Sequence, residues 1–479
     1  MSHIHNLVGH LNRYLPSTNH WLVLFSSVPV AIATGTLFVY SVYGTQLAEK
    51  CDLTAKQTAD LNIGATIGTA IGGLASGHVT DTYGTQLPML FSCISISLGY
   101  RWLYDLYNRG EESTMLELWL AMFLIGCGSV SGYFSSIKAV ALHFPNYRST
   151  AQSVTIASFA ISSMLFSLIS SIAFNGDVKR FLFFLHISSG LLLFIGFLFI
   201  RIEDHYDIVK NPDEEDSQAL LQQDTDESPS VRRMSSIESL KTSPLKKTLS
   251  HPVFWCHYIL LAVIQGLGQM YIYCVGYVVK AVHYYYTTTF PDESNPSLHT
   301  LQASQVSVVA ISSFLGRLSS GPSSDYIVGK LHLQRHWILV AGLSVMLVGH
   351  LMNLVDMKAF FTSLHGANAM LTLVSVLIGF SYGYSFTCYP AIVADMFNMK
   401  NYSFIWGLMY SSTVFGLMVM TKVFGHFYDK NTNDWDDNLQ DYVCAKASLC
   451  YDDAFKITSF ACLLVLVSML LYIYFRRQN

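Results

Sequence analysis

Charged side chains are scarce in this chain, since Asp, Glu, Lys and Arg together make up 13% of its 479 residues. A soluble globular chain carries roughly 25%, so the composition excludes an ordinary soluble domain. Hydrophobic residues reach 52% and gather in twelve runs, each long enough for a membrane-spanning helix of about 20 residues. The runs lie near 21–43, 59–80, 87–105, 116–140, 151–174, 181–201, 253–279, 303–322, 336–356, 367–393, 403–427 and 455–475.

The chain also lacks the local patterns of an enzyme or a cofactor-binding protein. It contains no nucleotide-binding loop and no nucleophile constellation, and none of its nine cysteines has the spacing of a zinc or haem site. Residues 1–20 are polar and no small-residue cleavage site follows, so we expect a retained anchor rather than a signal peptide. We therefore expect no enzyme activity, no cofactor, no metal and no nucleic-acid partner.

The runs fall into two groups of six, separated by a polar segment. That segment is rich in Ser, Asp, Glu and Lys and nearly free of aromatic residues, so it cannot bury enough apolar surface to fold alone. We predict a cytosolic tail, a six-helix bundle, a disordered cytosolic linker, a second six-helix bundle and a short cytosolic tail. Their bounds are 1–20, 21–201, 202–252, 253–475 and 476–479.

One short pattern occurs at the corresponding place in both halves. The second run ends in Gly77-x-x-x-Asp81-x-x-Gly84, and the eighth ends in Gly321-x-x-x-Asp325. Such repetition is typical of a duplicated transporter fold. The glycines allow neighbouring helices to approach, and the aspartate can accept hydrogen bonds from the N-terminus of a facing helix in one conformation and lose them in another. We predict that these five residues form a gating motif.

The first of these patterns resembles the signature loop of the major facilitator superfamily. "GRLSSGPSSD", "HFPNYRSTAQSV" and "IGFSYGYSFTCYPAIVADMF" are similar to its nodulin-like and monocarboxylate-transporter-like branch, above all to the fungal monocarboxylate-transporter homologues. The resemblance implies an all-α polytopic membrane protein with the 12-helix major facilitator fold, built from two pseudo-symmetric six-helix bundles. It also implies alternating access, cytosolic termini and a vacuolar membrane, with the plasma membrane as the alternative.

The chain departs from the family pattern around Asp81. Thr82, Thr85 and Gln86 stand where that pattern usually has basic residues. A gate locked by charge is therefore not expected from the sequence.

Few ionisable residues occur in the runs, and such residues at membrane depth are functional candidates. Arg317 fits two roles, because it can line the path of an anionic solute or brace the gate near Asp325, two helical turns further on. Lys138 is a second candidate for the solute path. The alternative for Lys138, as for Lys422, is a side chain that snorkels to the membrane edge.

Uncharged polar residues add to the candidate solute path. Gln265 and Gln269 form an i, i+4 pair, and Tyr382 and Tyr384 lie in a glycine-containing run. These groups suit a small, partly apolar solute. We expect a secondary active or facilitative transporter of a small organic anion, with a coupled proton left open. The alternatives are a transporter of a neutral or cationic metabolite such as an amino acid, and a non-transporting membrane sensor of the same fold.

Other polar or small residues in the runs are expected to be structural. We interpret His186 and His350 as packing residues with hydrogen-bond partners rather than as proton relays. Gly64, Gly68 and Gly72 recur every four residues, which predicts a seam for close contact with another helix.

The linker carries candidate sorting and regulatory signals. Asp216 stands four residues before Leu220 and Leu221, an arrangement that resembles the dileucine signal bound by clathrin-adaptor complexes. The alternative is that no partner protein recognises these loop residues. The phosphorylation candidates, where a phosphate would add about −1.5 to −2 charge, are Ser228, Ser235 and Ser243.

The loop before the last run is acidic and contains Cys444 and Cys450. These two cysteines can pair where the compartment is oxidising, and free thiols are the alternative.

Overall fold

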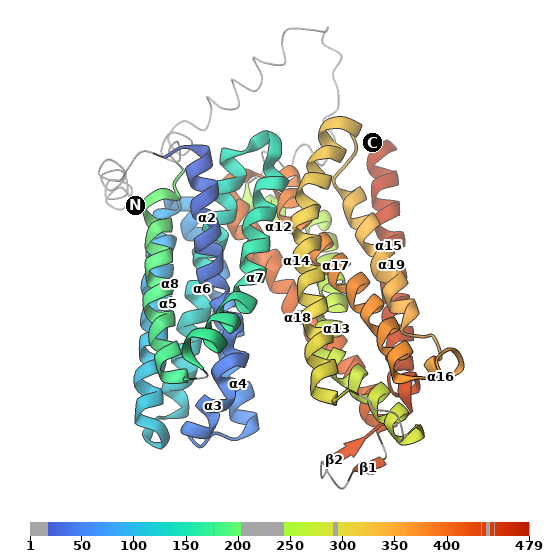
Figure 1. Cartoon of the computed structure of the whole chain (residues 1–479). Helices are drawn as coiled ribbons and strands as arrows, with labels where there is room; N and C mark the ends of the chain where they lie inside the picture. Colours follow the sequence, from blue (N-terminus) through green and yellow to red (C-terminus); the bar gives the residue numbers. More distant parts are fainter. Residues whose placement is uncertain are drawn as a thin grey trace. The chain divides into compact units, whose positions relative to one another are not determined.

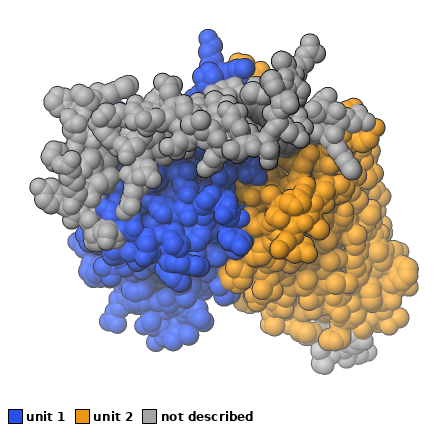
Figure 2. Space-filling view, turned by 90° about the horizontal axis from the view of Figure 1, so that it is seen from above, with its two compact units in different colours: residues 1–248, 393–408 blue, residues 249–392, 409–479 orange. Residues whose placement is uncertain are grey.

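The computed structural model describes residues 18–175, 177–202, 244–290, 296–432, 434–436, 441–444 and 446–478, and nearly all of them are helical (Figure 1). The chain divides into two compact units (Figure 2). Unit 1 comprises Met1–Thr248 and Val393–Leu408, and unit 2 comprises Leu249–Ile392 and Met409–Asn479. Residues 393–408, which the sequence assigns to the second bundle, thus group with unit 1.

Unit 1 is built mainly from long helices that pack around α6. In order, the helices are α2 (His20–Thr34), η1 (Gly35–Val39), α3 (Tyr40–Lys50), α4 (Ala55–Tyr83), α5 (Gln86–Arg109), η2 (Gly110–Glu112), α6 (Met115–His143), η3 (Pro145–Tyr147), α7 (Arg148–Phe174) and α8 (Val178–Phe199). Helix α6 contacts α2, α4, α5 and α7. It therefore lies at the centre of the unit.

Capping side chains explain why several of these helices begin outside the apolar runs. Thr54 and Gln57 form a capping box at the start of α4, and Thr114 and Glu117 form one at the start of α6. Each box satisfies two backbone N–H groups that a helix start leaves free. Helix α4 ends at Gly84, whose φ of 87° is accessible to glycine at little cost.

The glycine seam predicted in α4 faces α6. A Cβ on Gly68 would overlap the carbonyl oxygen of Phe123, and a Cβ on Gly72 would lie 2.7 Å from Cys127 Cα. Because a hydrogen takes the place of the side chain at these positions, the two backbones run nearly in contact. The seam packs helices within unit 1.

Unit 2 follows the short helix α12 (Leu245–Ser250) and contains the remaining long helices. They are α13 (Pro252–Thr289), α14 (Leu298–Leu331), α15 (His336–Met352), α17 (Leu364–Met396), α18 (Tyr402–Asn431) and α19 (Asp452–Gln478). The short helices α16 (Met357–Phe360) and η5 (Ala447–Cys450) also belong to unit 2, whereas η4 (Met399–Asn401) lies in the segment that groups with unit 1. Helices α17 and α18 extend into residues 393–408 of unit 1. An antiparallel hairpin, β1 (Asp434–Asp436) and β2 (Asp441–Val443), precedes η5.

All twelve predicted runs lie on helices, and eight helices of the described residues are long and apolar enough to cross a membrane. Several helices are longer than the runs that predicted them. Helix α14 continues through Pro322 to Leu331, so Asp325 lies inside the helix and not at its end as expected. A helix can extend past the apolar stretch because its hydrogen bonds are internal and need no lipid around them.

Candidate functional site

Asp81, in the last turn of α4, pairs with Lys138 of α6. Lys138 Nζ donates a hydrogen bond to Asp81 Oδ1 at 2.6 Å, and the two side chains are 3% and 6% exposed. The expectation of a gate without a charge lock is therefore wrong, and so is the alternative that Lys138 snorkels. Helix α6 packs along α4 and brings the ammonium group to the carboxylate. A role of Lys138 in solute translocation stays a prediction.

The same carboxylate caps the N-terminus of α18. The backbone N–H groups of Ser403 and Phe404 donate to the Asp81 oxygens at 3.0 and 2.8 Å. A helix N-terminus carries a partial positive charge that stabilises a nearby carboxylate. A Cβ on Gly77 would lie 2.6 Å from the Ser403 carbonyl oxygen, so glycine is needed for this approach. This is the hydrogen-bonding arrangement that the sequence led us to expect of Asp81.

Two further contacts hold residues 393–408 within unit 1, and both start from α7. Arg148 Nη1 donates to Asp395 Oδ1 at 3.2 Å, and Gln152 Nε2 donates to the Tyr402 hydroxyl at 2.9 Å. Together with Asp81 they fix the turn from α17 to α18 on the N-terminal bundle.

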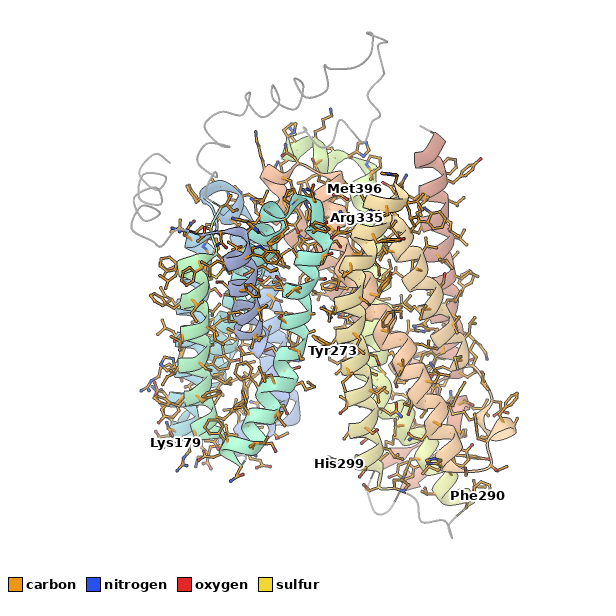
Figure 3. The ribbon with its side chains drawn as sticks, turned by 45° about the horizontal axis from the view of Figure 1, so that its top comes forward. Lys179, Tyr273, Phe290, His299, Arg335 and Met396 are labelled. Atoms are coloured by element: carbon orange, nitrogen blue, oxygen red, sulfur yellow. A yellow bond between two sulfur atoms is a disulfide. The ribbon has the colours of Figure 1, made fainter. Side chains whose placement is uncertain are left out.

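Asp325, the acidic residue of the second motif, pairs with Arg335 at the start of α15. Arg335 Nη1 donates to Asp325 Oδ1 at 2.7 Å and to Ser324 Oγ at 2.8 Å. Arg335 marks one end of unit 2 in Figure 3. Arg335 therefore occupies the place beside Asp325 in which Arg317 was one alternative, and a role of Arg317 in bracing the gate stays a prediction.

Arg317 instead faces aromatic rings of α17. Its guanidinium carbon lies 5.3 Å from the ring centroid of Tyr382 and 5.1 Å from that of Phe386. The residue is 7% exposed, and its Nε has no hydrogen-bond partner among the described residues. Among the residues that the structure describes, no carboxylate pairs with Arg317. Aromatic faces attract a cation, but Nε of the guanidinium gains no hydrogen bond from the described residues.

Close packing of α14 on α17 positions Arg317. A Cβ on Gly383 would overlap the carbonyl oxygen of Ser313 and lie 3.1 Å from Arg317 Cγ, and a Cβ on Gly379 would lie 2.7 Å from the Val309 carbonyl oxygen. The two glycines let the backbones approach, so the arginine stem lies flat along α17.

Helix α13 contributes the two glutamines of the candidate path. Gln269 Nε2 donates to the Tyr382 hydroxyl at 3.3 Å, which links α13 to the ring that contacts Arg317. Gln265, one turn earlier, is 0% exposed, and neither of its amide atoms has a hydrogen-bond partner in the part of the chain that the structure describes. Tyr273, one turn later, lies midway between the labelled residues at the two ends of unit 2 (Figure 3). The group is therefore placed near the middle of the unit.

One predicted residue of the solute path, Tyr384, lies outside the group around Arg317. Two residues of the site, Phe386 and Arg335, were not predicted from the sequence. Tyr384 stacks on Phe380, with ring centroids 5.5 Å from each other, and this contact is separate from those of Arg317. The sequence did not single out Phe386, although it follows Tyr382 by one helical turn, the spacing at which two rings share a helix face. Arg335 lies just outside the predicted run 336–356, and it is 7% exposed.

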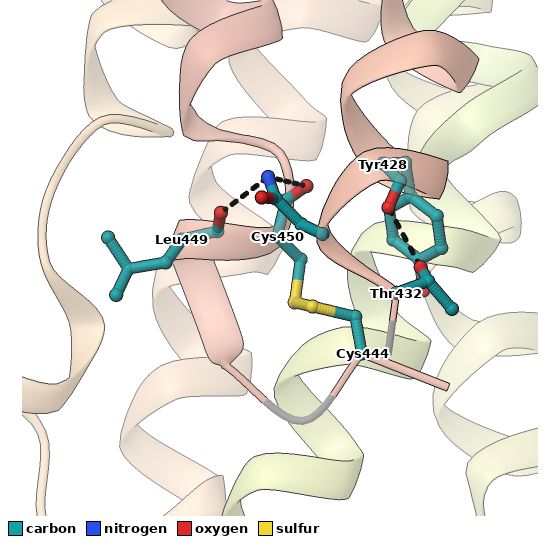
Figure 4. Close-up of a disulfide and its surroundings, with 6 residues drawn as sticks. Tyr428, Thr432, Cys444, Leu449 and Cys450 are labelled. Carbon is teal, nitrogen blue, oxygen red and sulfur yellow. Dashed lines mark hydrogen bonds between the residues drawn. A yellow bond between two sulfur atoms is a disulfide. The ribbon is translucent and has the colours of Figure 1, made fainter. Parts of the chain in front are cut away.

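Cys444 and Cys450 form a disulfide in the segment between α18 and α19 (Figure 4). The amide of Asn431 donates to the carbonyl oxygens of Leu449 and Cys450 at 3.1 and 3.2 Å. The bond and these hydrogen bonds hold η5 against the end of α18. Free thiols were the alternative from sequence.

The linker candidates lie outside the described residues, so their positions stay predictions. They are Asp216, Leu220, Leu221, Ser228, Ser235 and Ser243.

The sequence profile of the Major Facilitator Superfamily matches residues 23–331. This chain belongs to that superfamily. The protein named "Uncharacterized membrane protein YMR155W" of Saccharomyces cerevisiae is 28% identical over 98% of this chain and 98% of its own length. "Probable transporter MCH1" of Wickerhamomyces anomalus is 24% identical over 83% of this chain and 77% of its own length.

The solved structure of the proton:xylose symporter XylE is similar in fold, with a TM-score of 0.62 at 14% identity over 95% of this chain and 96% of XylE. The 12-helix major facilitator fold expected from sequence is thus confirmed, and the similarity to proteins named MCH1 agrees with the expected resemblance to fungal monocarboxylate-transporter homologues. The protein is a multi-pass membrane transporter rather than an enzyme, and its partners are a small solute and the bilayer.

Proposed function

We propose that this superfamily member carries a small organic anion across an intracellular membrane by alternating access, and that Arg317 binds the anion. The observation that carries the proposal is a buried guanidinium with aromatic neighbours and no acidic partner in the described chain. A buried cation without a counter-charge is costly. A bound carboxylate relieves that cost through a bidentate, charge-assisted contact.

The residues around Arg317 suit an anion with a small apolar part. Tyr382 and Phe386 offer ring faces, and Gln269 holds the Tyr382 hydroxyl in place. A second candidate, a neutral polar solute, is favoured by Gln265, whose buried amide offers one unused acceptor and two unused donors.

The gate in this proposal is the pair of acidic motifs. Asp81 binds the N-terminus of α18 and Lys138, and Asp325 binds Arg335. Release of these contacts in alternation would open the path on one side of the membrane.

The proposed compartment is the vacuole, with the linker and termini in the cytosol. A disulfide forms in oxidising compartments and is rare in the cytosol. Cys444–Cys450 therefore supports a non-cytosolic position for the segment between α18 and α19. The MCH1-like relatives and the dileucine-type pattern of the linker prompt the vacuolar choice.

Vesicles containing the purified protein test the proposal. Uptake of radiolabelled monocarboxylates and dicarboxylates is compared with uptake of neutral sugars and amino acids. We expect transport of an anion, and we expect Arg317→Gln to reduce it at least about tenfold, since hydrogen bonds to charged groups contribute about 1.5–3 kcal/mol. Arg317→Lys keeps the charge but loses the planar fork, so it should weaken apparent affinity.

Lys422→Gln is the matched control, because it removes an exposed cation from α18 in the same unit. It should leave uptake unchanged. Wild-type anion uptake by Arg317→Gln would refute the proposed contact, and uptake of neutral solutes alone would favour the second candidate.

A further inference from the structure

Two histidines that the sequence did not single out lie side by side in unit 2. His257 of α13 and His336 of α15 have ring centroids 5.3 Å apart, and both rings lie 4.9 Å from the ring of Tyr472 of α19. His257 is 1% exposed and His336 is 2% exposed. Imidazole is the side chain whose ordinary titration falls between about pH 5 and 8.

This pair adjoins the second gating motif. His336 follows Arg335 directly, and Arg335 binds Asp325 at 2.7 Å. Described residues of α13, α14, α15, α17 and α19 place titratable or charged groups near the pair. They include Cys256, Asp325, Arg335, Cys388, Tyr389 and Tyr472.

We propose that His257 and His336 together form a proton-binding site that takes up one proton and weakens the Asp325–Arg335 pair. Two imidazoles at this separation can together accept one proton on either ring, whereas a second proton would place like charges side by side. The proton comes from the aqueous side on which Arg335 lies, and no bond other than N–H forms or breaks.

The effect on the gate follows from charge. The shared proton adds a positive charge beside Arg335, which repels the guanidinium and competes with it for the Asp325 carboxylate. Acid on that face of the membrane thus loosens the contact between α14 and α15. The proposal does not depend on which solute the transporter carries.

Thermal unfolding of the purified full-length protein tests the site without any solute. The folded pair accepts one proton and the unfolded chain accepts two, so acidification should lower the unfolding midpoint. Between about pH 8 and pH 5, the wild type should lose about 2 °C more than the variant with both His257→Gln and His336→Gln. Two histidines that only pack, and stay neutral in the folded protein, would give a larger acid-induced loss to which each ring contributes separately.

The single variants test whether the two rings act as one unit. Each single substitution should remove most of the pH dependence that the pair gives to the unfolding midpoint, so that the effects of His257→Gln and His336→Gln do not add. If the double variant fails to fold, the two single variants are still sufficient for the test. His332→Asn, which alters an exposed histidine on the adjacent loop with φ of 53°, should keep the wild-type profile. The proposal would be overturned if wild type and variants had the same pH dependence. It would also be overturned if the pH-dependent effects of the two single substitutions simply added.

Discussion

Asp81 and Lys138 form a buried ion pair of 2.6 Å between α4 and α6, and the same carboxylate caps α18. Three elements thus meet at a single side chain. Because each charge is removed from water, neither residue can lose its partner without leaving an unpaired charge in a medium of low dielectric. The contact stabilises this conformation, and it is the contact that gating in the proposed function would have to break.

Lys138→Met should be strongly destabilising, by about 3–5 kcal/mol, because it leaves Asp81 buried without its cation. Adding Asp81→Asn should recover part of that loss, since no charge then stays unpaired and the amide oxygen still accepts a backbone N–H. The free energy of unfolding in detergent micelles measures both effects.

The exposed i, i+4 pair of Arg101 and Asp105, with side chains 44% and 42% exposed, supplies the control. Arg101→Met should cost less than about 1 kcal/mol. If Lys138→Met were equally mild, the buried pair would have no structural importance.

The helices were predictable because lipid demands long apolar stretches, and the glycines around Asp81 marked the end of α4. The partners of the acidic residues were not predictable. Lys138 is 57 residues from Asp81, and the sequence does not say which face of α6 meets α4. Arg335 stands just before an apolar run, where a loop position is the ordinary expectation, yet the packing of α14 on α15 buries it.

The disulfide yields a prediction about topology. Cys444 and Cys450 should resist thiol labelling in intact organelles and react only after reduction, with a reagent that reaches the lumenal face. Replacing both by Ser should lower the free energy of unfolding by about 2 kcal/mol, as expected for a short closed loop. Cys256, an exposed free thiol near the start of α13, should label without a reductant. Labelling of Cys444 from the cytosolic side would contradict the proposed orientation.

Localisation tests the linker motif. Leu220→Ala with Leu221→Ala should move a fluorescently tagged protein from the vacuolar membrane to another membrane, because the adaptor loses both apolar contacts. Asp216→Asn should have a weaker effect in the same direction. Gln223→Ala, in the same linker but outside the motif, serves as a control that should keep the wild-type distribution. Vacuolar localisation of the double-leucine variant would exclude the motif as a sorting signal.

Gly383→Ala tests how α17 positions Arg317. The new methyl group would collide with the Ser313 carbonyl oxygen and press on Arg317 Cγ, which should cost about 1–3 kcal/mol of stability and lower the apparent affinity for an anion. Gly329→Ala on α14 is the matched control, since a Cβ there meets nothing within 4 Å. Alanine should be neutral or slightly stabilising at that helical position. Equal effects of the two substitutions would show that the close approach is unimportant.

Gln265 and Gln305 give opposite expectations for the same substitution. Both are 0% exposed, but Gln305 donates to Asn368 Oδ1 and Thr372 Oγ1 and accepts from Ser375 Oγ. Gln305→Leu should therefore destabilise the protein by about 1–3 kcal/mol, because it leaves buried polar groups unpaired. Gln265→Leu removes an amide that no described residue hydrogen-bonds, so it should be neutral or stabilising.

The cost of Gln265→Leu should appear in transport instead. If the amide is kept free to bind the solute, its removal should raise the KM for a carried anion while the thermal midpoint holds or rises, the usual exchange between stability and activity at functional positions. Measuring uptake kinetics and unfolding on both variants separates the two roles. A loss of stability at Gln265 as large as that at Gln305 would mean that the folded protein already satisfies this amide, and Gln265 would then leave the solute path.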